Sequence, residues 1–106
     1  MPCYNAAMAM FHVVVRRSGP DYDHARPLDE QSGWDAHAAF MDALTEDGFI
    51  VLGGPLGGDG HRALLVVDAP DEAAVQARLD ADPWKPRMLV IDSVWPWTVL
   101  LDGARP

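Results

Sequence analysis

The segment GWDAHAAFMDALTEDGFIVLGGPLGGDGHRALLVVDA (residues 33–69) contains one helical pattern followed by two strand patterns. Residues 33–47 carry apolar side chains at helical spacing, and Gly48 is a residue type that often follows the last helical turn. Residues 49–54 and 61–69 are short apolar runs, several of them β-branched, which predicts two strands. The glycine-rich residues 55–60 predict a turn, so the two strands are expected to form a hairpin.

The flanking segments complete a six-element pattern. Residues 9–17 predict a first strand, and residues 70–81 predict a second helix with Pro70 in its first turn. Residues 87–101 predict a last strand that is interrupted at Pro96, which is typical of an edge strand or a bulge. The order is βαββαβ. It predicts an α+β, ferredoxin-like fold in which a four-stranded antiparallel sheet carries two helices on one face.

The chain has 106 residues, which predicts a single domain over residues 1–106. Residues 1–8 are expected to form a loose leader. Residues 18–32 are polar and rich in proline, aspartate and glycine, and a loop of that length is unusual in a compact domain. Such loops are commonly lids or binding loops, or else they are disordered.

The predicted strands are apolar on both sides. The runs VVV, FIVL, ALLVV and MLVI do not alternate with polar residues, as a sheet with one wet face would require. Two helices can cover only one face, and the other would leave a large exposed apolar patch. We therefore expect a homodimer that packs through this second face. The alternative is that the loop of residues 18–32 folds across it.

Charge and composition limit the classes of partner. The net charge is −8 and Lys85 is the single lysine, which argues against nucleic acid and anionic membranes as partners. Cys3 is the only cysteine, so no internal disulfide is possible. No run has the length of a membrane span. The first positive charges follow the apolar N-terminal part, the reverse of a secretory signal, so a cytoplasmic protein is expected.

His37 lies near the centre of the apolar stripe of the first predicted helix, where a leucine would pack better. A buried imidazole needs partners for both ring nitrogens, and each unmet group costs about 1–3 kcal/mol. Two interpretations remain open. His37 is either a core histidine bonded to a backbone carbonyl, or it has a chemical role.

Asp82 is the second unusual residue. It follows the second predicted helix, where the helix dipole disfavours a carboxylate by about 0.3–1 kcal/mol. It could cap the short turn that begins at Pro83. It could instead hold and orient an imidazole and raise its basicity. The sequence alone does not place Asp82 beside His37.

Other residues are candidates for the walls of a pocket. Trp34 and Trp84 lie close in sequence to the two unusual residues. Gly53 and Gly54 would let a ligand approach the backbone closely. The glycine-rich segment 51–60 lacks a G-K-[S/T] motif and leads into a strand, which favours a hairpin turn over a phosphate-binding loop.

His12 and Arg16 share one face of the first strand, on the expected pocket side. Arg16 could meet an anionic substrate group, with an exposed arginine at the strand end as the ordinary alternative. The four histidines are scattered without paired spacing, and the motif DYDH (21–24) lies in a polar loop, so no metal site is expected. The sequence has no nucleotide fingerprint and no cofactor is expected.

Several motifs in order resemble the YCII-related domain of the dimeric α/β barrel superfamily. They are R-x-G-P at residues 17–20, the block EQSGWDAHAAFMDALTEDGFIVLGGPL at residues 30–56 and ADPW at residues 81–84. The resemblance covers residues 11–100 and implies the same ferredoxin-like fold and a homodimer. It also implies that a histidine of the first helix and the aspartate of the Asp-Pro-aromatic motif form a dyad.

The residues that match this dyad are His37 and Asp82, and the resemblance places Gly54 and Pro55 near the same pocket. It implies no particular substrate, although a few relatives are linked to removing chloride from oxygenated ring compounds or rearranging them.

The predicted function is a small, cofactor-independent homodimeric enzyme. His37 would move a proton, and Asp82 would orient the imidazole and stabilise its charged form. The substrate would be a small, partly apolar organic molecule such as a cyclic compound, held by Trp34, Phe40 and Trp84, in a lyase, isomerase or hydrolase reaction. The alternative is a non-catalytic dimeric module that binds a small molecule or a protein.

Overall fold

The fold was determined as a computed structural model that describes residues 10–58 and 60–103. The predicted leader of residues 1–8 lies outside the described residues. The elements are β1 (Met10–Ser18), the short 3-10 helix η1 (Leu28–Glu30), α1 (Trp34–Glu46), β2 (Ile50–Leu56), β3 (Arg62–Val67), α2 (Glu72–Asp80) and β4 (Leu89–Thr98).

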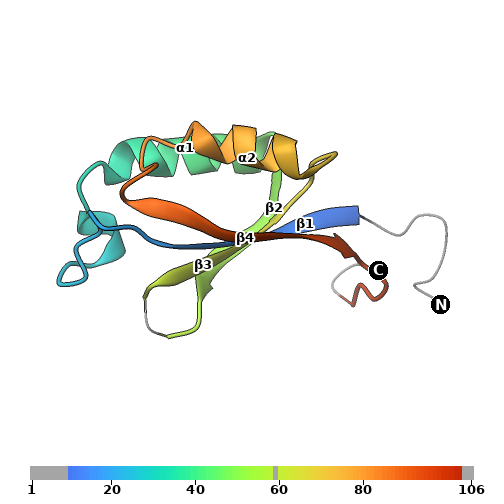
Figure 1. Ribbon diagram of the computed structural model, residues 1–106, viewed down its shortest axis with the longest axis horizontal. Coiled ribbons are helices and arrows are strands. Elements are labelled where there is room, and N and C mark those ends of the chain that lie inside the picture. The colour runs from blue at the N-terminus through green and yellow to red at the C-terminus, as the bar shows by residue number, and fades with distance from the viewer. Residues whose placement is uncertain (1–9, 59, 104–106) are drawn as a thin grey trace.

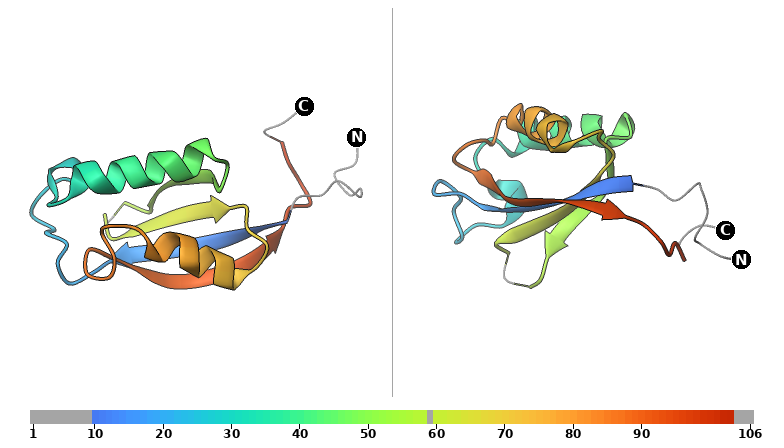
Figure 2. Two further views of the ribbon diagram at one scale, coloured as in Figure 1. Left: turned by 90° about the horizontal axis from the view of Figure 1, so that it is seen from above. Right: turned by 45° about the vertical axis from the view of Figure 1, so that its right-hand side comes forward.

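The strands form one antiparallel sheet with the order β2-β3-β1-β4. Both α-helices lie on the same face of this sheet (Figures 1 and 2). The predicted βαββαβ order and the ferredoxin-like fold are therefore confirmed. The two helices run in opposite directions across this face, so the end of α2 and the start of α1 lie at the same end of the molecule (Figure 2).

The two prolines of the strands lie at sheet edges. The residues Pro55 and Leu56, which we expected in the turn, instead belong to β2 and pair with Ala63 and Arg62. The prediction that β4 is interrupted at Pro96 is also wrong, because the strand continues to Thr98. β2 and β4 are the outer strands, and an outer strand tolerates a residue without an N–H because one of its sides has no neighbour.

The start of α2 also differs from the prediction. The helix begins at Glu72, and Asp71 is its N-cap, with a side-chain oxygen that accepts a hydrogen bond from the backbone N–H of Ala74 at 2.8 Å. Pro70 therefore lies before the helix and not in its first turn. An aspartate cap satisfies a helical N–H that would otherwise have no partner, which explains why the helix starts at this point.

We expect Asp71→Ala to lower the free energy of unfolding by about 1 kcal/mol, because the first turn of α2 loses its side-chain acceptor. Urea denaturation of the wild type and the variant measures this difference. Asp71→Asn is the matched control, since asparagine caps helices about as well as aspartate. Equal stability of the alanine and asparagine variants would show that the cap contributes nothing.

The main core lies between the helices and the sheet. All of β1, β2 and β3 contribute side chains to it, as does Phe49 just before β2; α1 contributes one, and α2 contributes the two buried residues of its narrow apolar side. The buried members are Val14, Leu44, Phe49, Ile50, Leu65, Val67, Val75 and Leu79.

The opposite face of the sheet is apolar as well. Because Val14 points into the core, its neighbours Val13 and Val15 point away from the helices. The partners of Val13 and Phe11 on β4 are Trp95 and Trp97, which are 65% and 43% exposed. None of the described helices covers this face (Figure 1).

The long loop between β1 and α1 does not cross this apolar face. It lies at the end of the sheet (Figure 1), where the backbone N–H groups of Gly19 and Asp21 donate to the carbonyls of Met88 and Arg87. The described residues therefore contradict the alternative in which this loop covers the second face.

None of the helices within residues 10–58 and 60–103 is long and apolar enough to cross a membrane.

Candidate functional site

The structure brings His37 and Asp82 into direct contact. His37 lies in the first turns of α1, and Asp82 follows the last turn of α2 by two residues. The distance from His37 Nδ1 to Asp82 Oδ1 is 2.9 Å, and both side chains are buried. The two residues are distant in sequence, and they meet because the fold places both helices on one face of the sheet.

Asp82 accepts hydrogen bonds from three parts of the chain. Its Oδ1 atom accepts from the imidazole and also from the backbone N–H of Trp84 at 2.9 Å. Its Oδ2 atom accepts from the Arg16 guanidinium at 2.6 Å. Asp82 therefore makes both of the contacts that the sequence suggested: it caps the turn after α2, and it contacts the imidazole.

The surroundings of Asp82 set its protonation state. Burial raises the pKa of this carboxyl, but hydrogen bonds from His37, Arg16 and the Trp84 N–H, together with the charge of Arg16, outweigh burial and hold the pKa below 3.8. An ionised carboxylate can only accept hydrogen bonds. The Nδ1 atom of His37 must therefore carry a proton, and when the ring is neutral its Nε2 atom is free to accept one.

This lowered pKa predicts how stability depends on pH. A carboxyl whose pKa is lower in the folded state contributes stability above its unfolded pKa of 3.8, and the contribution is lost as the pH falls through the folded value. We expect Asp82→Asn to be much less stable than the wild type at neutral pH. We expect this difference in the free energy of unfolding to become smaller as the pH falls below 3.8. Urea denaturation of both proteins at a series of pH values measures the difference.

Asp42→Asn, on the exposed side of α1, is the control for this series, and its difference from the wild type should stay small throughout. A gap between Asp82→Asn and the wild type that stays constant down to the lowest pH would contradict the assignment of an ionised, stabilising Asp82.

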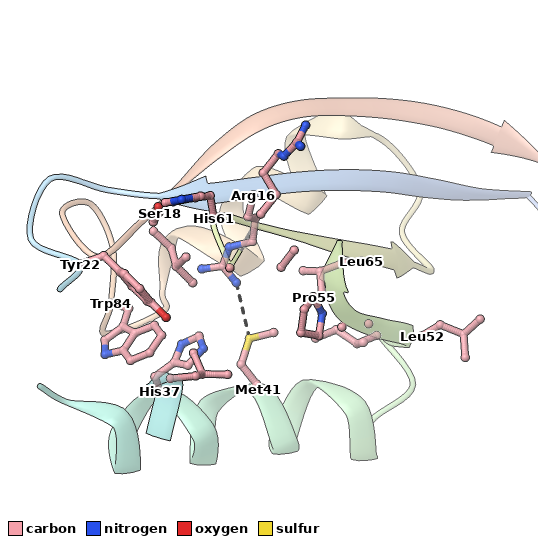
Figure 3. A pocket seen from close by; sticks show the side chains of 18 of the residues that line it. Arg16, Ser18, Tyr22, His37, Met41, Leu52, Pro55, His61, Leu65 and Trp84 are labelled. Atoms are coloured by element: carbon pink, nitrogen blue, oxygen red, sulfur yellow. Dashed lines mark hydrogen bonds between the residues drawn. The ribbon is translucent and has the colours of Figure 1, made fainter. Parts of the chain in front are cut away.

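The imidazole lines a cavity of about 580 Å³, which is within the usual range of about 300–1,000 Å³ for ligand pockets. β2 and β3 contribute most of the apolar wall, and polar groups come from α1, β1, the long loop and the residues at the start of β3 (Figure 3). The polar side chains in the wall include Arg16, Ser18, Tyr22, His37, Thr45, His61 and Arg62.

Trp84 fixes the plane of the imidazole. The rings of His37 and Trp84 are stacked, with centroids 3.9 Å apart and planes 6° apart. The indole Nε1–H of Trp84 donates to the carbonyl of Ser32 at 2.9 Å, which holds the indole in place. Trp34 lies 5.8 Å from both rings, and both tryptophans line the cavity. The imidazole is thus held by Asp82 at one edge and by an aromatic face on one side.

Arg16 is only 1% exposed, so the alternative of an exposed arginine at the strand end is wrong. The side chain turns toward the helices, pairs with Asp82 and lines the cavity. A guanidinium tolerates burial only where a carboxylate compensates its charge, and that carboxylate lies 66 residues away in sequence.

The remaining candidates divide into two groups. Gly54 and Pro55 line the cavity. Phe40 and His12 are not among the residues that line it. Phe40 packs against the main core, and His12 lies on β1 beside Val67 and Pro96, where its buried Nδ1 has no partner among the described residues. Phe40 lies on the same apolar stripe of the helix as His37, and His12 lies on the same face of the strand as Arg16. Both the stripe and the face extend beyond the cavity, and the sequence does not show where the cavity ends.

The long loop contributes residues that the sequence analysis did not single out. The buried Gln31 side chain accepts a hydrogen bond from the Asp23 N–H at 2.9 Å and donates to the carbonyls of Asp23 and Arg26 at 2.7 and 3.0 Å. Asp21 accepts two hydrogen bonds from Arg87. These contacts hold the loop in one conformation and place Tyr22 in the cavity wall. In the sequence, only the length of the loop indicated that it could contribute to a binding site.

Metal ligands do not cluster in the part of the chain that the structure describes. Within residues 10–58 and 60–103, no group of three His, Cys, Asp or Glu residues could hold a metal ion. His24 and His61 pack ring to ring near the cavity, with centroids 4.3 Å apart.

No family model matches the chain, and no curated protein matches it either. Its structure is similar to that of 5-chloro-2-hydroxyhydroquinone dehydrochlorinase from Burkholderia phenoliruptrix AC1100, solved in complex with 2,5-dihydroxybenzoquinone. The TM-score is 0.50 and the sequence identity is 19%, over 84% of this chain and 91% of that chain. At this identity the similarity shows the shared fold, and the YCII-related assignment stays a prediction from the motifs.

Proposed function

We propose that this protein is a small enzyme that moves a proton on a small, partly apolar organic substrate without a cofactor. The observation that carries the proposal is the contact between His37 Nδ1 and Asp82 Oδ1, on a ring that lines the cavity. We also propose, from the ordered motifs and the fold, that the chain is a YCII-related domain.

In this proposal, His37 and Asp82 each have a separate part in the reaction. Asp82 keeps the proton on Nδ1, so the other ring nitrogen, Nε2, is the base. Nε2 takes a proton from a C–H or O–H group of the substrate, and Asp82 stabilises the imidazolium that results. The proton then returns to the product or to the leaving group. In an elimination, the electron pair of the broken bond to hydrogen forms a double bond as the leaving group departs with its own bonding electrons.

The structural neighbour favours elimination from an oxygenated ring as the first reaction to test. A dehydrochlorinase removes hydrogen chloride from its substrate, which needs a base, and His37 supplies one in this chain. We would incubate the protein with 5-chloro-2-hydroxyhydroquinone and related chlorinated hydroxylated rings and measure chloride release. Release faster than in buffer, and lost on replacement of His37, would support the proposal. If release by the wild type and the His37 variant were equal for every compound, the proposal would fail.

We further propose that two copies pair through the apolar face that carries Trp95 and Trp97. Those side chains are exposed in the single chain, and an apolar sheet face of this kind is a frequent site of association. Light scattering coupled to size exclusion should give the mass of a dimer. Trp95→Asp should give a monomer, whereas Ala39→Asp, on the exposed side of α1, should remain a dimer. A monomeric wild type would refute this pairing.

A further inference from the structure

The Arg16 guanidinium has more hydrogen-bond donors than the surrounding residues can satisfy. It carries five N–H groups. Among the described residues, its NH2 atom donates to Asp82 Oδ2 at 2.6 Å, and its NH1 atom is 3.6 Å from Met41 Sδ, a weak acceptor. The Nε atom is buried and has no partner within residues 10–58 and 60–103. In that part of the chain, this buried cation therefore has a single oxygen acceptor.

Unsatisfied donors on a buried cation are rare in folded proteins, and a functional site is a common reason for them. The guanidinium lines the same cavity as the imidazole, and its NH1 atom contacts Met41, another residue of the cavity wall (Figure 3). A molecule bound beside His37 would thus lie close to the NH1 group, which has no oxygen partner among the described residues.

The cavity wall differs from the rest of the acidic chain in the charged side chains that it contains. The net charge is −8, yet no carboxylate is among the described residues that line the cavity, and Arg16 and Arg62 are. The other side of the cavity is apolar, with Ile50, Pro55 and Leu65 in its wall. Asp82 compensates the charge of Arg16, but a guanidinium with donors left over beside an apolar wall still matches a ligand with one negative oxygen and an apolar body.

We propose that the substrate of the function proposed above is a small organic anion whose charged oxygen binds Arg16. That the bound molecule is a substrate rests on the proposed function, whereas the preference for an anion rests on the cavity alone. The negative oxygen accepts hydrogen bonds from the NH1 group of the guanidinium, the apolar body lies against β2 and β3, and the reacting C–H or O–H group lies near His37.

Calorimetric titration with benzoate and benzamide tests the preference, because the two probes have the same shape and differ in charge. We expect benzoate to bind the wild-type protein at least tenfold more tightly. A second pair, 4-nitrophenol at a pH where it is ionised and nitrobenzene, distinguishes a ring oxyanion from a carboxylate. Equal binding within both pairs by the wild-type protein would overturn the inference.

Two variants test whether Arg16 causes the preference for benzoate over benzamide. Arg16→Met should abolish this preference, and Arg17→Met should retain it, because Arg17 is exposed and pairs with Asp92 instead. If Arg16→Met does not fold, Arg16→Met/Asp82→Asn removes both charges of the buried pair and serves the same purpose. A preference that survives the loss of Arg16 would overturn the assignment.

These binding measurements need no turnover, so they are independent of the proposed function. A clear preference for benzoate combined with activity that does not depend on His37 would keep the anion site and refute the proposed role of His37. Turnover that depends on His37, without any preference for the anion, would keep the enzyme and refute the anion site.

Discussion

Replacement of His37 by glutamine should lower turnover by about 10²–10⁴-fold, the usual contribution of a positioned acid–base group. Glutamine can still donate a hydrogen bond to Asp82 and fill most of the space beside Trp84, so the fold should survive. It cannot take up a proton near neutral pH. The measurement is kcat/KM with any substrate that the wild type turns over, together with circular dichroism to confirm that the variant is folded.

The control is His24→Gln, which makes the same change in the exposed part of the long loop. It should leave kcat/KM within a few-fold of the wild type. His37→Leu separates the enzyme from a binding module. In a module that only binds ligands, ligand affinity would survive in the leucine variant. Full turnover in the glutamine variant would remove His37 from the mechanism.

The largest effect on stability is expected for Arg16→Met. The guanidinium is the cationic partner of a buried carboxylate at 2.6 Å, and its removal leaves Asp82 without a compensating charge. Breaking a buried ion pair from one side typically costs about 3–5 kcal/mol. Urea denaturation at neutral pH should show a loss of this size, or no folded protein at all.

The double variant Arg16→Met/Asp82→Asn should recover much of this loss, because neither charge of the pair is then left alone. Arg17→Met is the matched control. Arg17 is the next residue on β1, it is exposed, and its ion pair with Asp92 is 3.6 Å long, so the change should cost less than about 1 kcal/mol. If the double variant is no more stable than the single one, the cost comes from packing and not from the unpaired charge.

The fold was predictable because its evidence is local. The helical spacing of residues 33–47 and the strand runs around the hairpin each depend on a few neighbouring residues, and their order left one plausible topology. The errors were at element ends. Pro55 continues β2 because an outer strand needs hydrogen bonds on one side only, and Pro70 precedes α2 because Asp71 is the better cap.

The site was predictable only in part. His37 and Asp82 each conflict with their local surroundings, one by its place on an apolar stripe and the other by its place at a helix end, and such conflicts often mark functional sites. The burial of Arg16 depends on a partner in a distant turn, which no local pattern shows. Tyr22 lies in the cavity wall in a loop that is held by contacts of Gln31 and Asp21, and no local pattern shows these contacts.

Asp82 is the shared acceptor of a strand, a helix and a turn, and this limits how the protein can change during evolution. Any substitution at that position alters chemistry and folding together, so selection can hardly adjust one without the other. New specificities should instead arise at Leu28 and Leu52, which line the cavity and are largely exposed. Among divergent descendants of this chain, we expect these two positions to vary freely while the carboxylate is retained.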